Sequence, residues 1–251
     1  MRMRHVVWTG GELLVTAGVL LLLLVVHQMW WTNLEAKDGA ERKVQALERE
    51  WGSGSGAPID SGGDADAGGD SDSDADTGPG RGQAGSGTRG SAGASNRPLP
   101  SQAYAVLSIP RLHLRAPVAE GISKRNVLNK GYVGHYAGTQ QPGQAGNFAV
   151  AGHRNTHGEP FRYLNRLRPG DTIEVETKAA VFTYAVDGIL PETSPGDSGV
   201  LRPVPRSLTR PTYGYTAPGH YLTLTTCTPE YTSKYRLVVW GKLMSMRPRG
   251  Q

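Results

Sequence analysis

A low-complexity stretch from residue 52 to residue 100 limits what this 251-residue chain can fold into. Gly, Ser, Ala and Asp dominate it, its only large aliphatic residues are Ile59 and Leu99, and it contains no aromatic residue. Such a segment buries too little apolar surface to offset the entropy lost on ordering, so we expect a disordered linker. A flexible chain of this length spans roughly 35 to 42 Å, enough to carry a folded domain away from a membrane surface.

The N-terminal part before this linker contains a candidate membrane span. Residues 13–26 carry no charge and are mostly Leu and Val, and Trp30 and Trp31 extend the apolar stretch to bilayer length. A cleaved signal peptide is the alternative, because Arg2 and Arg4 form a basic leader, but no small-x-small cleavage pattern follows. We therefore expect a retained transmembrane anchor at residues 13–31, preceded by a cytoplasmic tail at residues 1–12.

Residues 32–51 have heptad-like apolar spacing among mixed charges. This pattern predicts a juxtamembrane helix that continues out of the bilayer or lies along its surface, with only a spacing role. Basic residues flank the apolar stretch on both sides, so charge does not orient the helix. The net charge of +5 without a Lys/Arg block does not favour nucleic acid as a partner.

The remaining segment, residues 101–246, is rich in short β-type runs separated by Pro-Gly and Gly-Asp turn signals. This pattern predicts a mainly all-β domain, a single closed β-barrel of about eight strands. Short helices are expected near residues 124–129 and 160–167, and a C-terminal tail at 247–251. The predicted strands are residues 104–109, 113–118, 147–151, 172–177, 181–190, 221–227 and 235–243.

The only cysteine of the chain, Cys227, ends one of these strands. If residues 221–227 and 236–243 pair as an antiparallel hairpin, Cys227 lies opposite Arg236. Leu222 and Leu224 then face the core, while Cys227 ends a polar face. A lone cysteine is usually a small buried hydrophobe, but a neighbouring guanidinium can stabilise a thiolate or an oxyanion.

A nucleophilic cysteine also needs a base, and His153 is the best candidate among seven histidines. It ends the apolar run 148–152 as Cys227 ends its own strand, so a barrel places both at one rim. His157, four residues later, is the fallback. The other histidines have less suitable contexts: His5 and His27 flank the apolar stretch, His113 is expected to face solvent from a strand, and His135 and His220 lie in turn-like Gly-His-Tyr sequences with surface or hydrogen-bonding roles.

Three motifs together resemble the catalytic signatures of sortases, the bacterial cysteine transpeptidases that attach proteins to peptidoglycan. They are Ala151-Gly152-His153-Arg154, Thr223-Leu224-Thr225-Thr226-Cys227 and Arg236-Leu237-Val238-Val239. The resemblance spans residues 101–243. Gly134-His135-Tyr136 and Thr228-Pro229 are most similar to the class E branch of high-GC Gram-positive bacteria.

The resemblance implies a membrane-anchored sortase with an extracellular catalytic domain. Cys227 would attack the Thr-Gly bond of a C-terminal sorting signal on a secreted protein, His153 would protonate the leaving amine, and Arg236 would hold the substrate carbonyl or the oxyanion. An amine of a lipid-linked peptidoglycan precursor would then accept the acyl group. Class E resemblance implies a Leu-Ala-x-Thr-Gly rather than a Leu-Pro-x-Thr-Gly signal. Thr226 and Tyr231 are candidate substrate-binding residues, although strand packing and a surface loop position explain them equally well.

Ordinary pKa values of about 8.5 for cysteine and 6.5 for histidine put the thiolate–imidazolium pair at about one part in a hundred of the neutral pair. Unless the site shifts these values, we expect a slow enzyme. We expect no cofactor or metal, because one cysteine and the scattered histidines lack metal-ligand spacing. Two alternatives remain: a membrane-tethered, non-catalytic β-barrel that binds peptides or wall components, and a hydrolytic cysteine peptidase.

Overall fold

The computed structural model describes residues 2–53 and 97–249. Most of the segment expected to form a linker, residues 54–96, lies outside the described residues. In chain order the elements are α1 (Arg2–Ser53), β1 (Ala103–Ile109), η1 (Pro110–Leu112), β2 (Leu114–Glu120), η2 (Leu128–Lys130), β3 (Val133–His135), β4 (Gly146–Ala151), η3 (Leu164–Arg166), β5 (Thr172–Thr177), β6 (Ala180–Thr193), η4 (Ser198–Leu201), β7 (His220–Thr228) and β8 (Tyr235–Pro248), where η denotes a short 3₁₀ helix.

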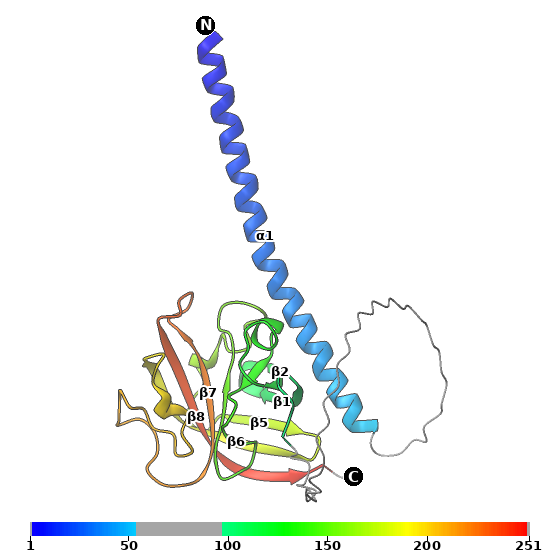
Figure 1. The fold of residues 1–251 in the computed structure, drawn as a ribbon, viewed down its shortest axis with the longest axis vertical. Coiled ribbons are helices and arrows are strands. Elements are labelled where there is room, and N and C mark those ends of the chain that lie inside the picture. The colour runs from blue at the N-terminus through cyan, green and yellow to red at the C-terminus, as the bar shows by residue number, and fades with distance from the viewer. Residues whose placement is uncertain (1, 54–96, 250–251) are drawn as a thin grey trace, which may run out of the picture.

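The strands close into one barrel in the order β1-β2-β3-β4-β7-β8-β6-β5, which confirms the predicted eight-stranded β-barrel (Figure 1). Neighbouring strands are antiparallel except for two parallel pairs, β2 with β3 and β4 with β7. A parallel pair needs a crossover connection. The crossover from β4 to β7 contains β5, β6 and η4, and it brings the ends of β4 and β7 side by side.

Several local predictions are wrong in detail. The three-residue strand β3 contains His135, which the sequence placed in a turn, whereas His113 adopts a left-handed conformation just before β2 rather than lying in a strand. The expected short helices at 124–129 and 160–167 are reduced to the 3₁₀ turns η2 and η3. β8 continues to Pro248, so the predicted tail at 247–251 begins inside a strand.

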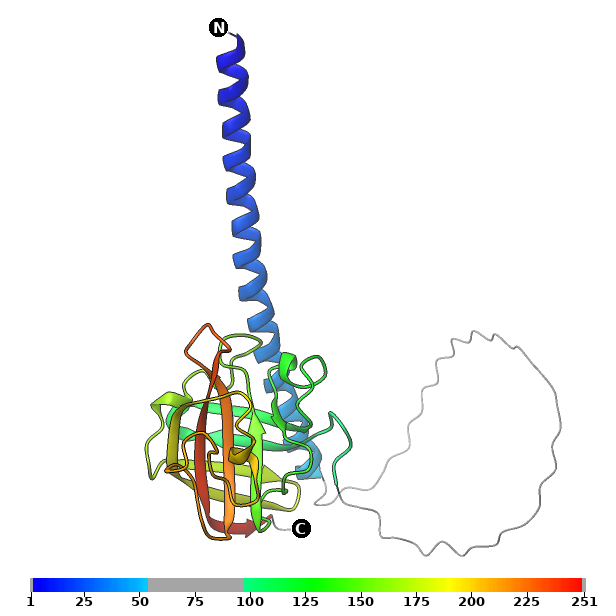
Figure 2. The ribbon, with the colours of Figure 1, turned by 60° about the vertical axis from the view of Figure 1, so that its left-hand side comes forward.

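Helix α1 runs unbroken through both the predicted anchor and the predicted juxtamembrane segment. Residues 11–52 form a helix that is long and apolar enough to cross a membrane by length and composition, and the side chains of its apolar stretch are exposed. In two views 60° apart, the N-terminal, apolar half of α1 projects past the end of the barrel where the β7–β8 loop lies (Figures 1 and 2).

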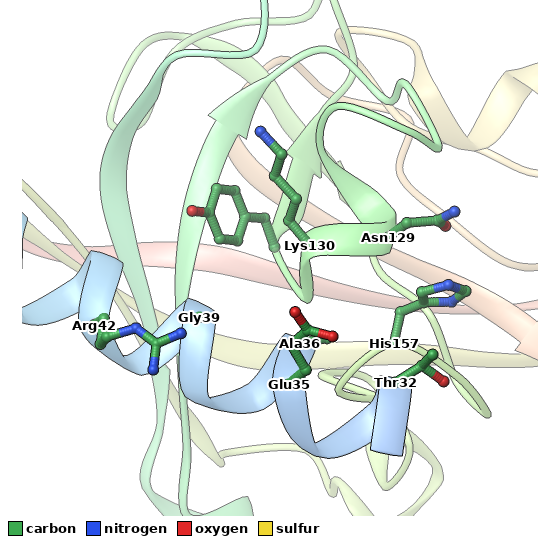
Figure 3. A pocket seen from close by; sticks show the side chains of 9 residues that line it. Thr32, Glu35, Ala36, Gly39, Arg42, Asn129, Lys130 and His157 are labelled. Atoms are coloured by element: carbon green, nitrogen blue, oxygen red, sulfur yellow. The ribbon is translucent and has the colours of Figure 1, made fainter. Parts of the chain in front are cut away.

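The second half of α1 packs on the outside of the barrel (Figure 3). Ala36, Ala40, Val44 and Leu47 repeat at helical spacing and are buried, the last two against β1 and β2. Burial of an aliphatic side chain such as Leu47 contributes about 1.5 to 3 kcal/mol. The segment is therefore a docked part of the domain, and the purely spacing role inferred from its sequence is wrong.

Contacts at the two ends of this docked segment define its direction. Near its start, Asn33 Oδ1 accepts a hydrogen bond of 2.6 Å from the backbone N–H of Gly158, in the loop after β4. Near its end, the Trp51 ring lies 5.0 Å from the guanidinium carbon of Arg249, just beyond the far end of β8. The apolar half of α1 therefore leaves the barrel at the end where β4 and β7 terminate.

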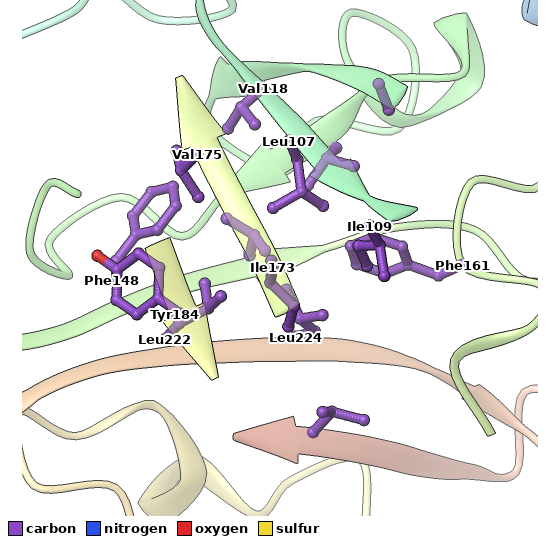
Figure 4. Packing of buried hydrophobic residues seen from close by; sticks show 14 of the residues in the cluster. Leu107, Ile109, Val118, Phe148, Phe161, Ile173, Val175, Tyr184, Leu222 and Leu224 are labelled. Atoms are coloured by element: carbon purple, nitrogen blue, oxygen red, sulfur yellow. The ribbon is translucent and has the colours of Figure 1, made fainter. Parts of the chain in front are cut away.

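The barrel interior is a single apolar cluster contributed by all of the longer strands (Figure 4). Leu222 and Leu224 of β7 lie in this core, as the alternation of the strand predicted, with Phe148 and Val150 of the parallel neighbour β4. Phe161, from the loop after β4, is fully buried in this cluster. Its burial anchors the loop that contains His153.

The outer face of β7 is polar, as predicted, but it is not open to solvent. Thr223 is fully buried, and its hydroxyl donates to Asn147 Oδ1 at 2.7 Å. The side-chain amide of Asn147 donates in turn to the carbonyl oxygen of Val200, at 3.3 Å. The long β6–β7 connection, which contains η4, thus covers this face, on which only Cys227 is partly exposed.

Candidate active site

Cys227 and Arg236 are directly opposite each other in the antiparallel β7–β8 pair, which confirms the predicted hairpin register. Cys227 is a free, partly exposed thiol. The Arg236 guanidinium donates through Nη1 to the carbonyl oxygens of Ser233 and Tyr235, at 3.0 and 2.9 Å. These bonds hold a permanent positive charge at the mouth of the hairpin, on the strand that faces the thiol.

His153 reaches the same end of the barrel from β4. Ala151 pairs with Thr225 in the parallel β4–β7 ladder, so His153 and Cys227 each lie two residues beyond a paired position. Gly152, which links Ala151 to His153, donates its N–H to the Thr225 carbonyl oxygen at 3.2 Å. A side chain at Gly152 is excluded, because a Cβ there would lie 2.8 Å from the Phe161 ring.

The His153 ring is oriented by two neighbours. Its Nε2 lies 2.9 Å from Oδ1 of Asn129, a residue of η2, and its ring stacks on that of His157 with centroids 5.3 Å apart. Because an amide oxygen only accepts, this contact assigns the hydrogen to Nε2 and leaves Nδ1 with the free lone pair. When the ring is neutral, Nδ1 is therefore its basic nitrogen.

The electrostatics of the site favour that neutral form. Burial, and after it charge repulsion from the nearby His157 and Lys124, together lower the pKa of His153 to about 4. Burial also lowers the pKa of His157. At neutral pH the imidazolium of His153 is therefore rarer than ordinary values predict, which strengthens the expectation of a small active fraction.

Arg154 is part of the Ala151–Arg154 motif, but the sequence alone indicated no role for it. Its buried guanidinium donates through Nη1 to the carbonyl oxygen of Cys227 at 3.2 Å and to the Thr228 hydroxyl at 2.9 Å. The residue after His153 thereby ties the end of β4 to the end of β7. Adjacency to His153 was the only sequence signal for it.

A small groove adjoins the Arg236 side of the site. It has a volume of about 170 Å³. The β6–β7 connection, which sequence reasoning used only for its Pro195-Gly196-Asp197 turn signal, forms one wall. The groove is lined by Tyr136, residues 193–198, Val200, Leu201, Thr225, Arg236 and Val238.

Asp197 holds this wall together. It is buried and accepts hydrogen bonds from the Ser207, Thr193 and Thr209 hydroxyls and from the backbone N–H of Leu208. Burial alone raises the pKa of Asp197, but these hydrogen bonds outweigh burial and lower it. The wall is therefore built around a carboxylate that stays charged.

The two predicted substrate-binding residues lie apart from each other. Thr226 is only 3% exposed and its hydroxyl donates to the Gly152 carbonyl at 2.8 Å, which favours a role in placing His153. Tyr231, in the β7–β8 loop, is 74% exposed, and its hydroxyl accepts a hydrogen bond of 2.9 Å from Arg162. Within the described residues, no group of three His, Cys, Asp or Glu side chains is placed to hold a metal ion.

The fold and the site together define the class of protein. It is a closed eight-stranded β-barrel that carries a thiol, an imidazole and a guanidinium at one rim. Residues 107–244 match the sortase domain family model. The chain is 44% identical over 246 residues to Sortase SrtE1 of Streptomyces coelicolor, a match that covers 96% of this chain and 58% of that protein. It is 34% identical over 239 residues to Sortase SrtE2 of the same organism, covering 93% of this chain and 80% of the relative.

Structural similarity agrees with these matches. A crystal structure of Sortase E1 from Streptomyces coelicolor with a tripeptide in the active site has a TM-score of 0.56 and 54% sequence identity, and covers 61% of this chain and 94% of that one. The chain belongs to the sortase family and is most like its class E members, as its motifs indicated.

Proposed function

We propose that this protein is a membrane-anchored cysteine transpeptidase that cleaves a C-terminal sorting signal between Thr and Gly and transfers the acyl group to an amine. The observation that carries the proposal is the convergence of Cys227, His153 and Arg236 from β7, β4 and β8 at one end of the barrel. Membership of the sortase family supports the same chemistry.

The first half of the reaction forms a thioester. The Cys227 thiol passes its proton to His153, whose free lone pair is on Nδ1, and the sulfur attacks the threonine carbonyl carbon. Arg236 stabilises the negative charge that develops on the carbonyl oxygen. His153 then gives the proton to the glycine amine as the C–N bond breaks. The acyl-enzyme remains on Cys227.

The second half resolves the thioester with an incoming amine. We propose that the acceptor is an amine of a lipid-linked peptidoglycan precursor, and that residues 13–31 of α1 anchor the enzyme with its barrel outside the cell. The exposed apolar half of α1 supports an anchor. The signal is proposed to be of the Leu-Ala-x-Thr-Gly type, with Tyr231 as a contact from the β7–β8 loop.

The full-length chain in detergent micelles provides the test. It is incubated with Leu-Ala-x-Thr-Gly and Leu-Pro-x-Thr-Gly peptides, with and without an amine, and Cys227 adducts and products are followed by mass. We expect a thioester on Cys227 and an amide product that depends on the amine, neither of which forms with Cys227→Ala. Cleavage without amine incorporation would indicate a hydrolytic peptidase. Absence of both adduct and cleavage would indicate a non-catalytic binder.

A further inference from the structure

We propose that the pocket between α1 and the loops beside His153 binds the acyl acceptor and selects a peptide that carries both an amine and a carboxylate. The inference rests on the proposed function, because it places the second substrate of that reaction. The pocket has a volume of about 530 Å³. It is lined by Thr32, Glu35, Ala36, Gly39, Arg42, Asn129, Lys130, Tyr132 and His157.

The pocket exists only because α1 is docked. One wall is the helix face from Thr32 to Arg42, and the facing wall is the β2–β3 connection with Asn129 and Lys130 (Figure 3). The two walls approach closely at Gly131, where an added Cβ would lie 2.7 Å from the carbonyl oxygen of Ala36. Residues of the barrel alone therefore form half of the pocket.

Charges of both signs line this space without neutralising one another. Among the described residues, none of Glu35, Arg42 and Lys130 takes part in an ion pair. Glu35 and Arg42 are seven residues apart, so they lie on one face of α1. A carboxylate suits an ammonium group, and a guanidinium suits a carboxylate. Their combination fits a zwitterionic peptide end.

The pocket is connected to the base by two contacts. Asn129 lines the pocket and holds His153 Nε2, and His157 lines the pocket and stacks on the His153 ring. Arg236, in contrast, lines the separate groove under the β6–β7 connection. The acyl donor and the acceptor thus approach from opposite sides of the site.

The transfer step balances with the groups in place. The acceptor amine attacks the thioester carbonyl, the C–N bond forms and the C–S bond breaks. The leaving thiolate takes up one proton, which the amine loses through His153. Ammonium binding at Glu35 holds the amine-bearing end near this base. The ammonium loses one proton to solvent before the attack, and the second proton, lost as the C–N bond forms, is the one that His153 passes to the thiolate.

The position along α1 fits an acceptor attached to a lipid. Thr32, at one edge of the pocket, directly follows Trp30 and Trp31, residues of the kind that gather at the membrane–water interface. The apolar half of α1 extends from this same end of the barrel (Figures 1 and 2). A peptide extending a short way from the bilayer surface therefore reaches the pocket.

The test measures the ratio of transfer to hydrolysis for the full-length chain in detergent micelles with a Leu-Ala-x-Thr-Gly donor. Both products come from one thioester, so the ratio does not depend on how fast the thioester forms. Glycylglycine and glycylglycine amide are the probes, since they differ only in the carboxylate. We expect the parent to favour glycylglycine by about tenfold at subsaturating concentrations, Arg42→Gln to remove this preference, and Glu35→Gln to lower transfer to both probes by about tenfold.

Glu41→Gln, on an exposed turn of the same helix outside the pocket, and Arg247→Gln, on the exposed end of β8, are the matched controls and keep the parental ratio. Detection of the thioester by mass shows that each variant is folded. Parental ratios in Glu35→Gln and Arg42→Gln, or a parent that transfers to another amine but to neither dipeptide, would overturn the acceptor pocket alone. A parent that only hydrolyses the donor, whatever amine is added, would overturn the proposed transfer reaction. A parent that forms no thioester would overturn the proposed function, and the pocket's role with it.

Discussion

The guanidinium of Arg154 donates a hydrogen bond to the carbonyl oxygen of Cys227, 73 residues away in the sequence, at 3.2 Å. The same nitrogen donates to the Thr228 hydroxyl at 2.9 Å. Because Arg154 directly follows His153, one buried side chain links the strand end that carries the base to the strand end that carries the thiol. The spacing of the two reacting groups therefore depends on a residue that touches neither substrate nor reacting atoms.

Replacing Arg154 tests this positioning role. We expect Arg154→Met to lower kcat for thioester formation at least about tenfold and the free energy of unfolding by about 1 to 3 kcal/mol, because two partly buried acceptors lose their donor. The KM for the donor peptide should change little. Arg154→Lys should restore part of kcat, since an ammonium can still reach one acceptor. An equal loss in both variants, in step with stability, would contradict a positioning role.

The low pKa of His153 predicts an unusual pH profile. The acid limb of kcat/KM for the donor peptide should lie near pH 4 rather than near pH 6.5. Because the folded pKa lies below the unfolded value, the contribution of a neutral His153 to stability is complete above about pH 6.5 and is lost as the pH falls toward 4. Steady-state rates, with circular dichroism at each pH, measure both effects.

Replacing His157 should move the acid limb. His157 lowers the pKa of His153 by charge repulsion, second in size to burial. His157→Gln removes that charge, so the limb should shift to higher pH. Lys130→Gln is the control, because Lys130 is not among the groups that lower the pKa of His153. An unchanged limb in His157→Gln, with the fold intact, would show that His157 does not contribute to the low pKa of His153.

Two glycines allow the docking of α1 to be tested with a matched pair. Gly131 and Gly121 have positive φ values of 76° and 88°, so alanine costs about 1 to 2 kcal/mol at either position. Only at Gly131 does the added Cβ meet the helix, whereas at Gly121 nothing lies within 4 Å. We expect Gly131→Ala to reduce hydrogen-exchange protection of residues 33–47 and Gly121→Ala to leave it unchanged. Equal protection in both would argue against the docked helix.

The buried Asp197 should make the groove wall sensitive to acid. Asp197→Asn removes acceptor capacity from a site with several donors, so we expect a loss of about 2 kcal/mol in the free energy of unfolding and a higher KM for the donor peptide. In the folded protein the pKa of Asp197 lies below its ordinary value of 3.8. The difference in the free energy of unfolding between the parent and Asp197→Asn is therefore complete above about pH 4 and shrinks as the pH falls below it. Denaturant titrations across pH measure this, with the exposed Asp187→Asn as control.

Local sequence patterns predicted the positions of the candidate site residues better than they predicted the strands around the site. Cys227 and Arg236 belong to one hairpin, where alternation and loop length determine which residues face each other. His153 was found because an apolar run ends at it. β3 was missed because a strand of three residues with a glycine at its centre carries no periodicity. His135 lies there, buried, with Nδ1 2.6 Å from Glu120 Oε2.

By itself, the sequence determined the barrel class, the apolar stretch of α1 and the chemistry of the thiol, imidazole and guanidinium, because each follows from residue types at short spacing. Only the tertiary structure decided that Arg154 clamps Cys227, that the β6–β7 connection walls a groove at Arg236, and that α1 docks beside His153 to form a charged pocket. Those features join segments tens of residues apart, and long-range packing leaves no periodic trace in the chain.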